Sequence, residues 1–101
     1  MFLTPTAFTA AFPHNHAESA LTRLVDTPQG KRPYGENILY WICAATLAGL
    51  PATAAPIGRA STSLPVGIQI VGPMWEDATP IEFAALMADT VGGFTPPPGF
   101  E

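Results

Sequence analysis

Two histidines separated by one residue, His14 and His16, are the first side chains in this sequence that suggest chemistry. Imidazoles at this spacing on an extended segment can chelate a metal ion, and Glu18 is the nearest further ligand. A structural zinc site requires more Cys or His ligands than this segment offers. We therefore expect ordinary loop histidines and no metal site.

The nucleophilic side chains also lack suitable neighbours. Cys43 stands among apolar residues, where a thiol has no base to deprotonate it, so packing is its expected role. Lys31 precedes Arg32 in a polar stretch, and there a solvated charge is expected rather than a general base. The three serines are Ser19, Ser61 and Ser63. No residue of this chain is assigned a catalytic role.

The composition of the chain suggests surfaces that are meant to be covered. The chain has 101 residues, enough for one small domain, with 48% apolar and 12% charged residues. An average globular chain carries about 25% charged residues. Because a small domain has much surface for its volume, it should carry more charge than average, not less. We infer that much of the surface is buried against something else.

Charge and hydropathy exclude several classes of partner. The net charge is −4, and the four basic residues form no patch, so we expect no nucleic acid and no anionic membrane surface. No apolar run approaches the roughly 20 residues of a membrane span, and the N-terminal segment lacks a charged signal-peptide start. A single cysteine fits a reducing, cytoplasmic location. The Gly92-Gly93 pair follows a predicted helix instead of opening one, so no phosphate-binding loop and no cofactor are expected.

The N-terminal third of the sequence predicts little regular structure. Residues 1–8 begin apolar and are broken by Pro5, which indicates the end of a strand. Residues 9–35 contain several prolines and glycines, which predict a long loop with at most a helical turn at 17–24. Such a long loop is uncommon in a compact domain unless it covers something.

The middle of the chain predicts a helix and then a hairpin. Residues 36–49 are apolar on nearly all sides, as in a buried core helix, and a glycine and a proline follow. Residues 53–71 predict two strands joined by a loop of small and polar residues. In the second strand, Gly67 permits close packing, and the amide of Gln69 can bond to a neighbouring backbone group.

A last helix is predicted over 79–91. Thr79 with Glu82 forms a capping box, and Asp77 is the alternative cap. Its packing face should be narrow and consist of Ile81, Ala84, Ala85, Ala88 and Val91. The tail over 94–101 is rich in proline and predicts a polyproline-like segment on a surface.

Several short motifs follow one another in a characteristic order. They are LTPT at 3–6, GLPA at 49–52, PIG at 56–58, LPVGIQIVGP at 64–73 and GGFTPPPGF at 92–100. Together they resemble the C-terminal region of the amidase signature hydrolases, which cleave carboxylic amides. The long motif at 64–73 is the most specific of the set.

The resemblance implies a fold of the α/β class, an α/β/α sandwich around a large mixed sheet. Residues 1–101 would be the C-terminal portion of that domain, and alone an α+β fragment with a β-hairpin and two main helices. Family members use a Ser–Ser–Lys triad and an oxyanion hole of backbone N–H groups. Nothing in this sequence matches the triad segment, so the chain should be inactive by itself.

The resemblance also suggests a substrate-lining surface. Loops at strand ends often line pockets in α/β folds. Thr6, Phe8 and Trp41 lie near such a loop and the following helix, and in a complete enzyme they could shape the acyl or leaving-group pocket. Core or interface packing is the alternative role. The expected partners are the remainder of an amidase domain or a second copy, with a small amide substrate only in a complete enzyme.

Two functions of different classes remain open from the sequence. The first is a scaffold segment of an amidase, without the chemistry. The second is a small non-catalytic binding or assembly module that oligomerises or docks on a larger subunit. The second function predicts a stable fold with the apolar helix 36–49 in an interface. An upstream reading frame that encodes the triad segment would favour the first.

Overall fold

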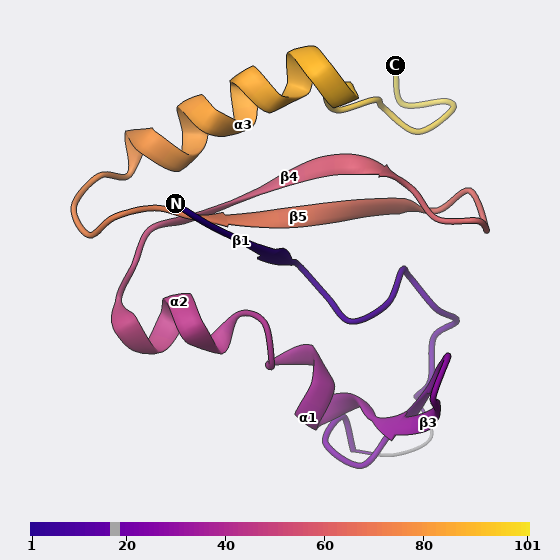
Figure 1. Ribbon diagram of the computed structural model, residues 1–101. Helices are drawn as coiled ribbons and strands as arrows, with labels where there is room; N and C mark the ends of the chain where they lie inside the picture. Colours follow the sequence, from indigo (N-terminus) through magenta and orange to yellow (C-terminus); the bar gives the residue numbers. More distant parts are fainter. Residues whose placement is uncertain (17–18) are drawn as a thin grey trace.

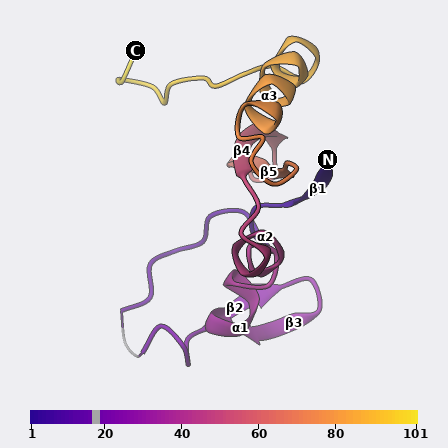
Figure 2. The same cartoon turned by 90° about the vertical axis from the view of Figure 1, so that its left-hand side faces the viewer.

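The computed structural model describes residues 1–16 and 19–101, which form an α+β arrangement with antiparallel strands. Helix α3 lies on one side of a three-stranded sheet, while α1, α2 and the β2–β3 hairpin lie on the other (Figure 1, Figure 2). The elements in chain order are β1 Phe2–Pro5, β2 Leu24–Thr27, β3 Gly30–Pro33, α1 Tyr34–Ile38, α2 Cys43–Ala48, β4 Ala52–Arg59, β5 Pro65–Val71 and α3 Ala78–Val91.

Strand β5 is the centre of the main sheet, whose order is β1-β5-β4. Its side chains alternate between the two faces, as in any strand. Ile70, which is fully buried, faces α3 together with its cross-strand partners Leu3 and Thr53. Gln69 faces the opposite side with Thr4. The alternating pattern expected for the second strand of the 53–71 hairpin therefore separates an apolar face from a polar one.

Helix α3 packs through a different face from the one expected. Ile81 is 59% exposed, Val91 is 45% exposed and Ala85 is also exposed, so the predicted narrow face is wrong at these three positions. It is confirmed at Ala84 and Ala88, which are half-buried. The residues turned toward the sheet include two large apolar side chains and a buried proline near the start of the helix. They are Pro80, Phe83, Ala84, Met87 and Ala88. A phenylalanine and a methionine bury more apolar area than alanines do, and this area decides the rotation of the helix.

The helix also begins without the expected capping box. Asp77 occupies the N-cap position, and its side chain makes no cap hydrogen bond. The Thr79 hydroxyl donates instead to the carboxylate of Glu76, with Oγ1 3.0 Å from Oε2. The interaction therefore satisfies a side chain and not a backbone N–H of the first turn.

The prediction that residues 9–35 form a loop is wrong for its second half. Strands β2 and β3 form an antiparallel hairpin there, with Thr27 paired to Gly30. Pro28 and Gly30 suit the second and last positions of a β-turn, and Gly30 has a positive φ of 96°. The hairpin was missed because its strands show no apolar alternation. The helical turn expected at 17–24 begins at residues outside the described part of the chain.

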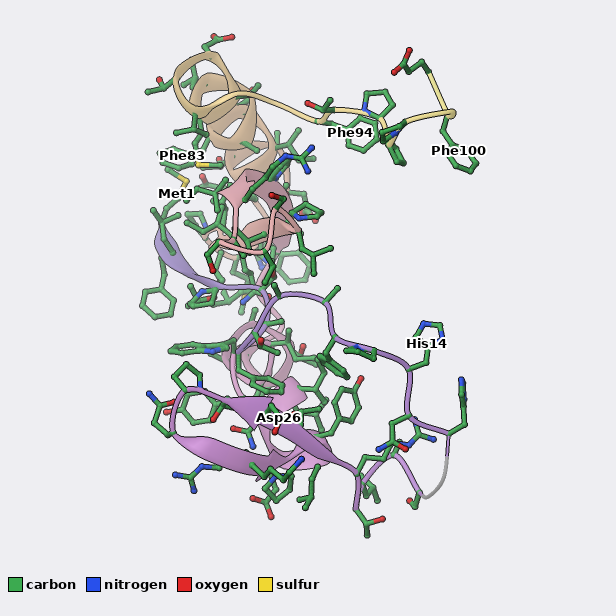
Figure 3. All side chains as sticks on the ribbon, turned by 90° about the vertical axis from the view of Figure 1, so that its right-hand side faces the viewer. Met1, His14, Asp26, Phe83, Phe94 and Phe100 are labelled. Atoms are coloured by element: carbon green, nitrogen blue, oxygen red, sulfur yellow. The ribbon has the colours of Figure 1, made fainter. Side chains whose placement is uncertain are left out.

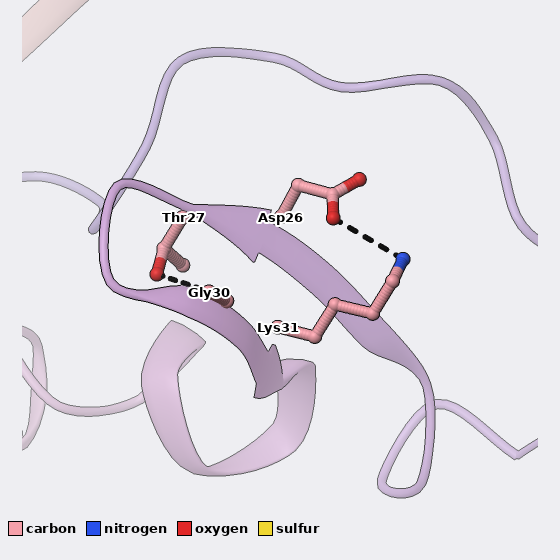
Figure 4. Close-up of polar contacts among 4 residues, drawn as sticks. All are labelled: Asp26, Thr27, Gly30 and Lys31. Carbon is pink, nitrogen blue, oxygen red and sulfur yellow. Dashed lines mark hydrogen bonds and ion pairs between the residues drawn. The ribbon is translucent and has the colours of Figure 1, made fainter.

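An ion pair crosses this hairpin at its surface. Lys31 Nζ lies 3.1 Å from Asp26 Oδ1, and the Thr27 hydroxyl donates to the Gly30 carbonyl at 2.7 Å (Figure 4). The two charged side chains are 64% and 86% exposed.

Because the ion pair is solvated, we expect Lys31→Ala to change the free energy of unfolding by less than about 0.5 kcal/mol. Thermal unfolding at low and high salt measures this change. A large loss of stability would show that the pair is buried in solution.

The chain encloses little core for its size. Its accessible surface is 7316 Å², whereas a compact protein of this mass exposes about 5,500 Å². Its radius of gyration is 15.3 Å, against about 13 Å for a compact domain of this length. Large apolar side chains are correspondingly exposed, among them Leu47, Trp75, Phe94 and Phe100. Figure 3 shows the last two on the tail, which extends away from the sheet.

No helix in the described ranges has the length and hydropathy that crossing a membrane would require.

Candidate functional site

The side chains that could do chemistry are dispersed over the surface. Lys31 is engaged with Asp26, and Ser61 and Ser63 are exposed in the turn between β4 and β5. Cys43 is half-buried at the start of α2. None of the hydrogen bonds seen in residues 1–16 and 19–101 joins a serine or cysteine side chain to a general base.

The two histidines lie on the N-terminal loop. Their rings meet edge-on with centroids 5.5 Å apart, and Figure 3 shows His14 projecting away from the sheet. Within the described residues, no group of three or more His, Cys, Asp or Glu side chains is placed to hold a metal ion. Glu18, the further ligand considered from sequence, lies outside those residues.

The best-defined polar arrangement lies on the face of β5 opposite α3. The side chain of Gln69 is almost fully buried, and its Nε2 donates to Thr4 Oγ1 at 3.1 Å and to the Trp41 carbonyl at 3.2 Å. Two residues earlier, the Gly67 carbonyl accepts a hydrogen bond from Thr6 Oγ1 at 3.2 Å. We call these five residues the β5 clamp, because β5 holds both the end of β1 and the connection between α1 and α2.

The clamp confirms the two roles expected for this strand. A Cβ added at Gly67 would lie 3.3 Å from both the Ala55 carbonyl oxygen and Thr6 Oγ1, so the glycine permits a close approach. Gln69 satisfies a backbone carbonyl, as its position in the strand suggested. The side-chain amide of Gln69 is buried, and leaving a buried donor unsatisfied costs about 1–3 kcal/mol, so these hydrogen bonds stabilise the arrangement.

The clamp brings two of the three expected lining residues to one strand face. Thr6 and Trp41 are both half-buried and both bond to β5. Phe8 is half-buried on the same segment as Thr6, but no hydrogen bond or ring contact among the described residues joins it to either of them. The structure therefore groups Thr6 with Trp41 through their hydrogen bonds to β5 and shows no such bond for Phe8 among the described residues.

The single helix expected over 36–49 is wrong, because the chain forms two short helices. Helix α1 ends at Ile38, and α2 begins at Cys43. The connection between them is tight, with Tyr40 N–H to the Asn37 carbonyl at 3.4 Å and Cys43 N–H to Leu39 at 3.0 Å. The carbonyl directed at Gln69 belongs to this connection. The sequence did not predict this break, because residues 39–42 contain no glycine or proline.

Two hollows lie elsewhere on the molecule. The larger, about 670 Å³, is formed by the N-terminal loop and the β2–β3 hairpin, with Arg23, Lys31 and Tyr34 among its lining residues. The smaller, about 430 Å³, lies between the loop end of the β4–β5 hairpin and the tail. Thr6, Phe8 and Trp41 line neither of them. These two hollows therefore do not involve the expected lining residues.

Comparison with known proteins gives a consistent assignment. A family profile described as Amidase matches residues 1–80. A glutamyl-tRNA(Gln) amidotransferase subunit from Rhodospirillum rubrum is 32% identical over 100 residues, which cover 99% of this chain and 18% of that protein. A fatty acid amide hydrolase of Arabidopsis thaliana is 36% identical over 53 residues, 52% of this chain and 9% of that protein. The chain thus spans a small part of the length of these relatives.

Proposed function

This chain belongs to the amidase family, and from that premise we propose that it is a scaffold part of an amidase domain. The catalytic groups of that domain come from residues outside these 101. The relatives are named for amide chemistry, one as part of an amidotransferase and the other as an amide hydrolase, and each is several times longer than this chain. The chain alone is inactive.

The observation that carries the proposal is the position of Lys31. The family triad needs a lysine beside a serine as its base, and this is the one lysine in the sequence. Its ammonium group is exposed and paired with Asp26 on the hairpin surface. Within the described residues this lysine is paired with Asp26 and not with a serine, which supports a base that lies elsewhere in a complete enzyme.

The complete domain is proposed to be the α/β/α sandwich of the family. In it, β1, β5 and β4 join a larger mixed sheet, with α3 in one covering layer and α1 and α2 in the other. Two features support this arrangement. Both edge strands of the small sheet are open to further pairing, and exposed apolar side chains such as Leu47 remain to be covered.

Thr6, Phe8 and Trp41 are proposed to line the substrate pocket of that domain. The clamp places Thr6 and Trp41 on one face of β5, at the side where β1 runs into its loop. The opposite wall and the triad would come from the remainder of the domain, so only the complete enzyme binds a small amide.

The purified 101-residue chain tests the inactivity directly. We expect it to release no product from simple amide substrates above the uncatalysed rate, because it lacks a nucleophile–base pair. We also expect self-association that increases with chain concentration in light scattering, since its apolar surface is uncovered. Turnover proportional to chain concentration, and retained through successive purification steps, would contradict the proposal.

A further inference from the structure

We infer that Gln69 is a positioning residue that holds open a break in the helix between α1 and α2, and so fixes Trp41. Its side-chain amide draws the Trp41 carbonyl out of a helix that would otherwise run from Tyr34 to Ala48. The inference rests on the proposed function only in giving Trp41 a place in the pocket wall.

The local sequence supplies no reason for the break. Residues 39–42 are Leu, Tyr, Trp and Ile, without the glycine or proline that commonly ends a helix. None of these residue types is strongly unfavourable in a helix. A sharp break without Gly or Pro is caused by a π-bulge or by a group that inserts into the backbone hydrogen bonds. A side chain inserted from another element would account for the break.

Gln69 is placed to be that group. In an unbroken helix the Trp41 carbonyl would accept from the N–H of Ala45. Among the described residues, backbone bonds run from Cys43 to Leu39 and from Thr46 to Ile42, but none runs from Ala45 to Trp41. The donor at that carbonyl is the buried Gln69 amide, on the central strand of the sheet.

The position of the Trp41 ring depends on this break. Neighbouring side chains on a helix point in different directions and do not face each other. The rings of Tyr40 and Trp41 nevertheless meet edge-on, with centroids 5.0 Å apart and an interplanar angle of 87°. Restoring the helix would separate these rings and turn Trp41 away from its present site beside β5.

The test is made in the 101-residue chain carrying Trp75→Phe, so that Trp41 is the only tryptophan. Two substitutions are compared in this background. Gln69→Leu should slow hydrogen exchange at the Ala45 amide by about tenfold, because that amide gains a helical hydrogen bond. It should also shift the fluorescence emission of Trp41. Thr6→Val is the matched control, because it removes a hydrogen bond from the same strand face without touching Trp41. It should alter neither signal.

Gln69→Met covers the case in which the leucine variant does not fold. Methionine keeps the length of the side chain and is apolar, so it suits the buried position, but it carries no N–H group to donate to the Trp41 carbonyl. It should therefore reproduce the changes at Ala45 and Trp41.

Several outcomes would overturn the inference. They are unchanged signals in both Gln69 variants, equal changes in Thr6→Val, failure of both Gln69 variants to fold, and a parent chain whose Ala45 amide is already exchanging as in an unbroken helix. Neither readout requires amide hydrolysis. Failure of the proposed function would therefore leave this test intact, and the two failures can be told apart.

Discussion

Gly72→Ala is expected to lower the free energy of unfolding by about 1–3 kcal/mol and to loosen α3 from the sheet. A Cβ at this position would lie 2.7 Å from Cδ and 3.0 Å from Cγ of Pro80, and 3.4 Å from Cγ of Pro51. Both neighbours are rigid rings, and the Gly72 N–H is fixed by a 2.8 Å bond to the Pro51 carbonyl. The methyl group can be accommodated only if the start of α3 moves. Urea unfolding followed by circular dichroism measures the loss.

Gly93→Ala provides the matched control at the other end of the same helix. There the nearest atom to an added Cβ is that of Ala88, at 3.5 Å, an ordinary van der Waals contact. We expect the free energy of unfolding to change by no more than about 0.5 kcal/mol. Equal losses in the two variants would show that α3 does not pack on Gly72 as described.

The Gly72 contact explains part of the motif on which the resemblance rests. The motif LPVGIQIVGP at 64–73 contains four residues with a structural role. Gly67 permits the close approach of Thr6, Gln69 donates hydrogen bonds through its amide, Ile70 is buried, and Gly72 leaves room for the Pro80 ring. Each of these residues acts through packing or backbone bonding. The motif therefore connects the sheet to α3 on one side and to the α1–α2 connection on the other, which fits a scaffold role.

Features that depend on neighbours along the chain could be predicted from the sequence. The alternation of Val66, Ile68 and Ile70 predicted the strand that became β5, and the small polar loop before it predicted its antiparallel partner. Helix α3 was likewise visible, since an apolar run follows its start and glycines follow its end. These signals are local, so the sequence alone carries them.

Features that depend on distant residues could not be predicted in the same way. The break at Trp41 follows from Gln69, which is 28 positions away in the sequence. The face that α3 buries follows from the volume available above the sheet, which favours Phe83 and Met87 over the alanines. The roles of Gly67 and Gln69 were foreseeable, whereas their partners Thr6 and Trp41 emerged only from the fold.

The largest expected effect is the difference in activity between a complete relative that lacks this region and one in which this chain replaces it. In this graft, the stretch of the Rhodospirillum rubrum protein that matches this chain would be replaced by this chain. Since cores tolerate many simultaneous apolar substitutions when volume and patterning are kept, we expect amidotransferase activity within about tenfold of the parent enzyme. Removal of the stretch should abolish activity, because it deletes a central strand and its covering helices.

Two further variants make this graft decisive for the scaffold role. Gly72→Ala in the graft should reduce the amount of folded enzyme, because the added methyl group clashes with Pro80 at the start of α3. Lys31→Ala should leave activity unchanged, because Lys31 is a solvated surface charge and the proposed function assigns the catalytic groups to residues outside this chain.

The most direct test of the account is therefore the activity of the Lys31→Ala graft compared with the unmodified graft. Equal activities, both far above that of the 101-residue chain alone, are the predicted result. A folded Lys31→Ala graft that loses activity would show that this chain supplies a catalytic group, and would contradict the assignment of the chain as scaffold.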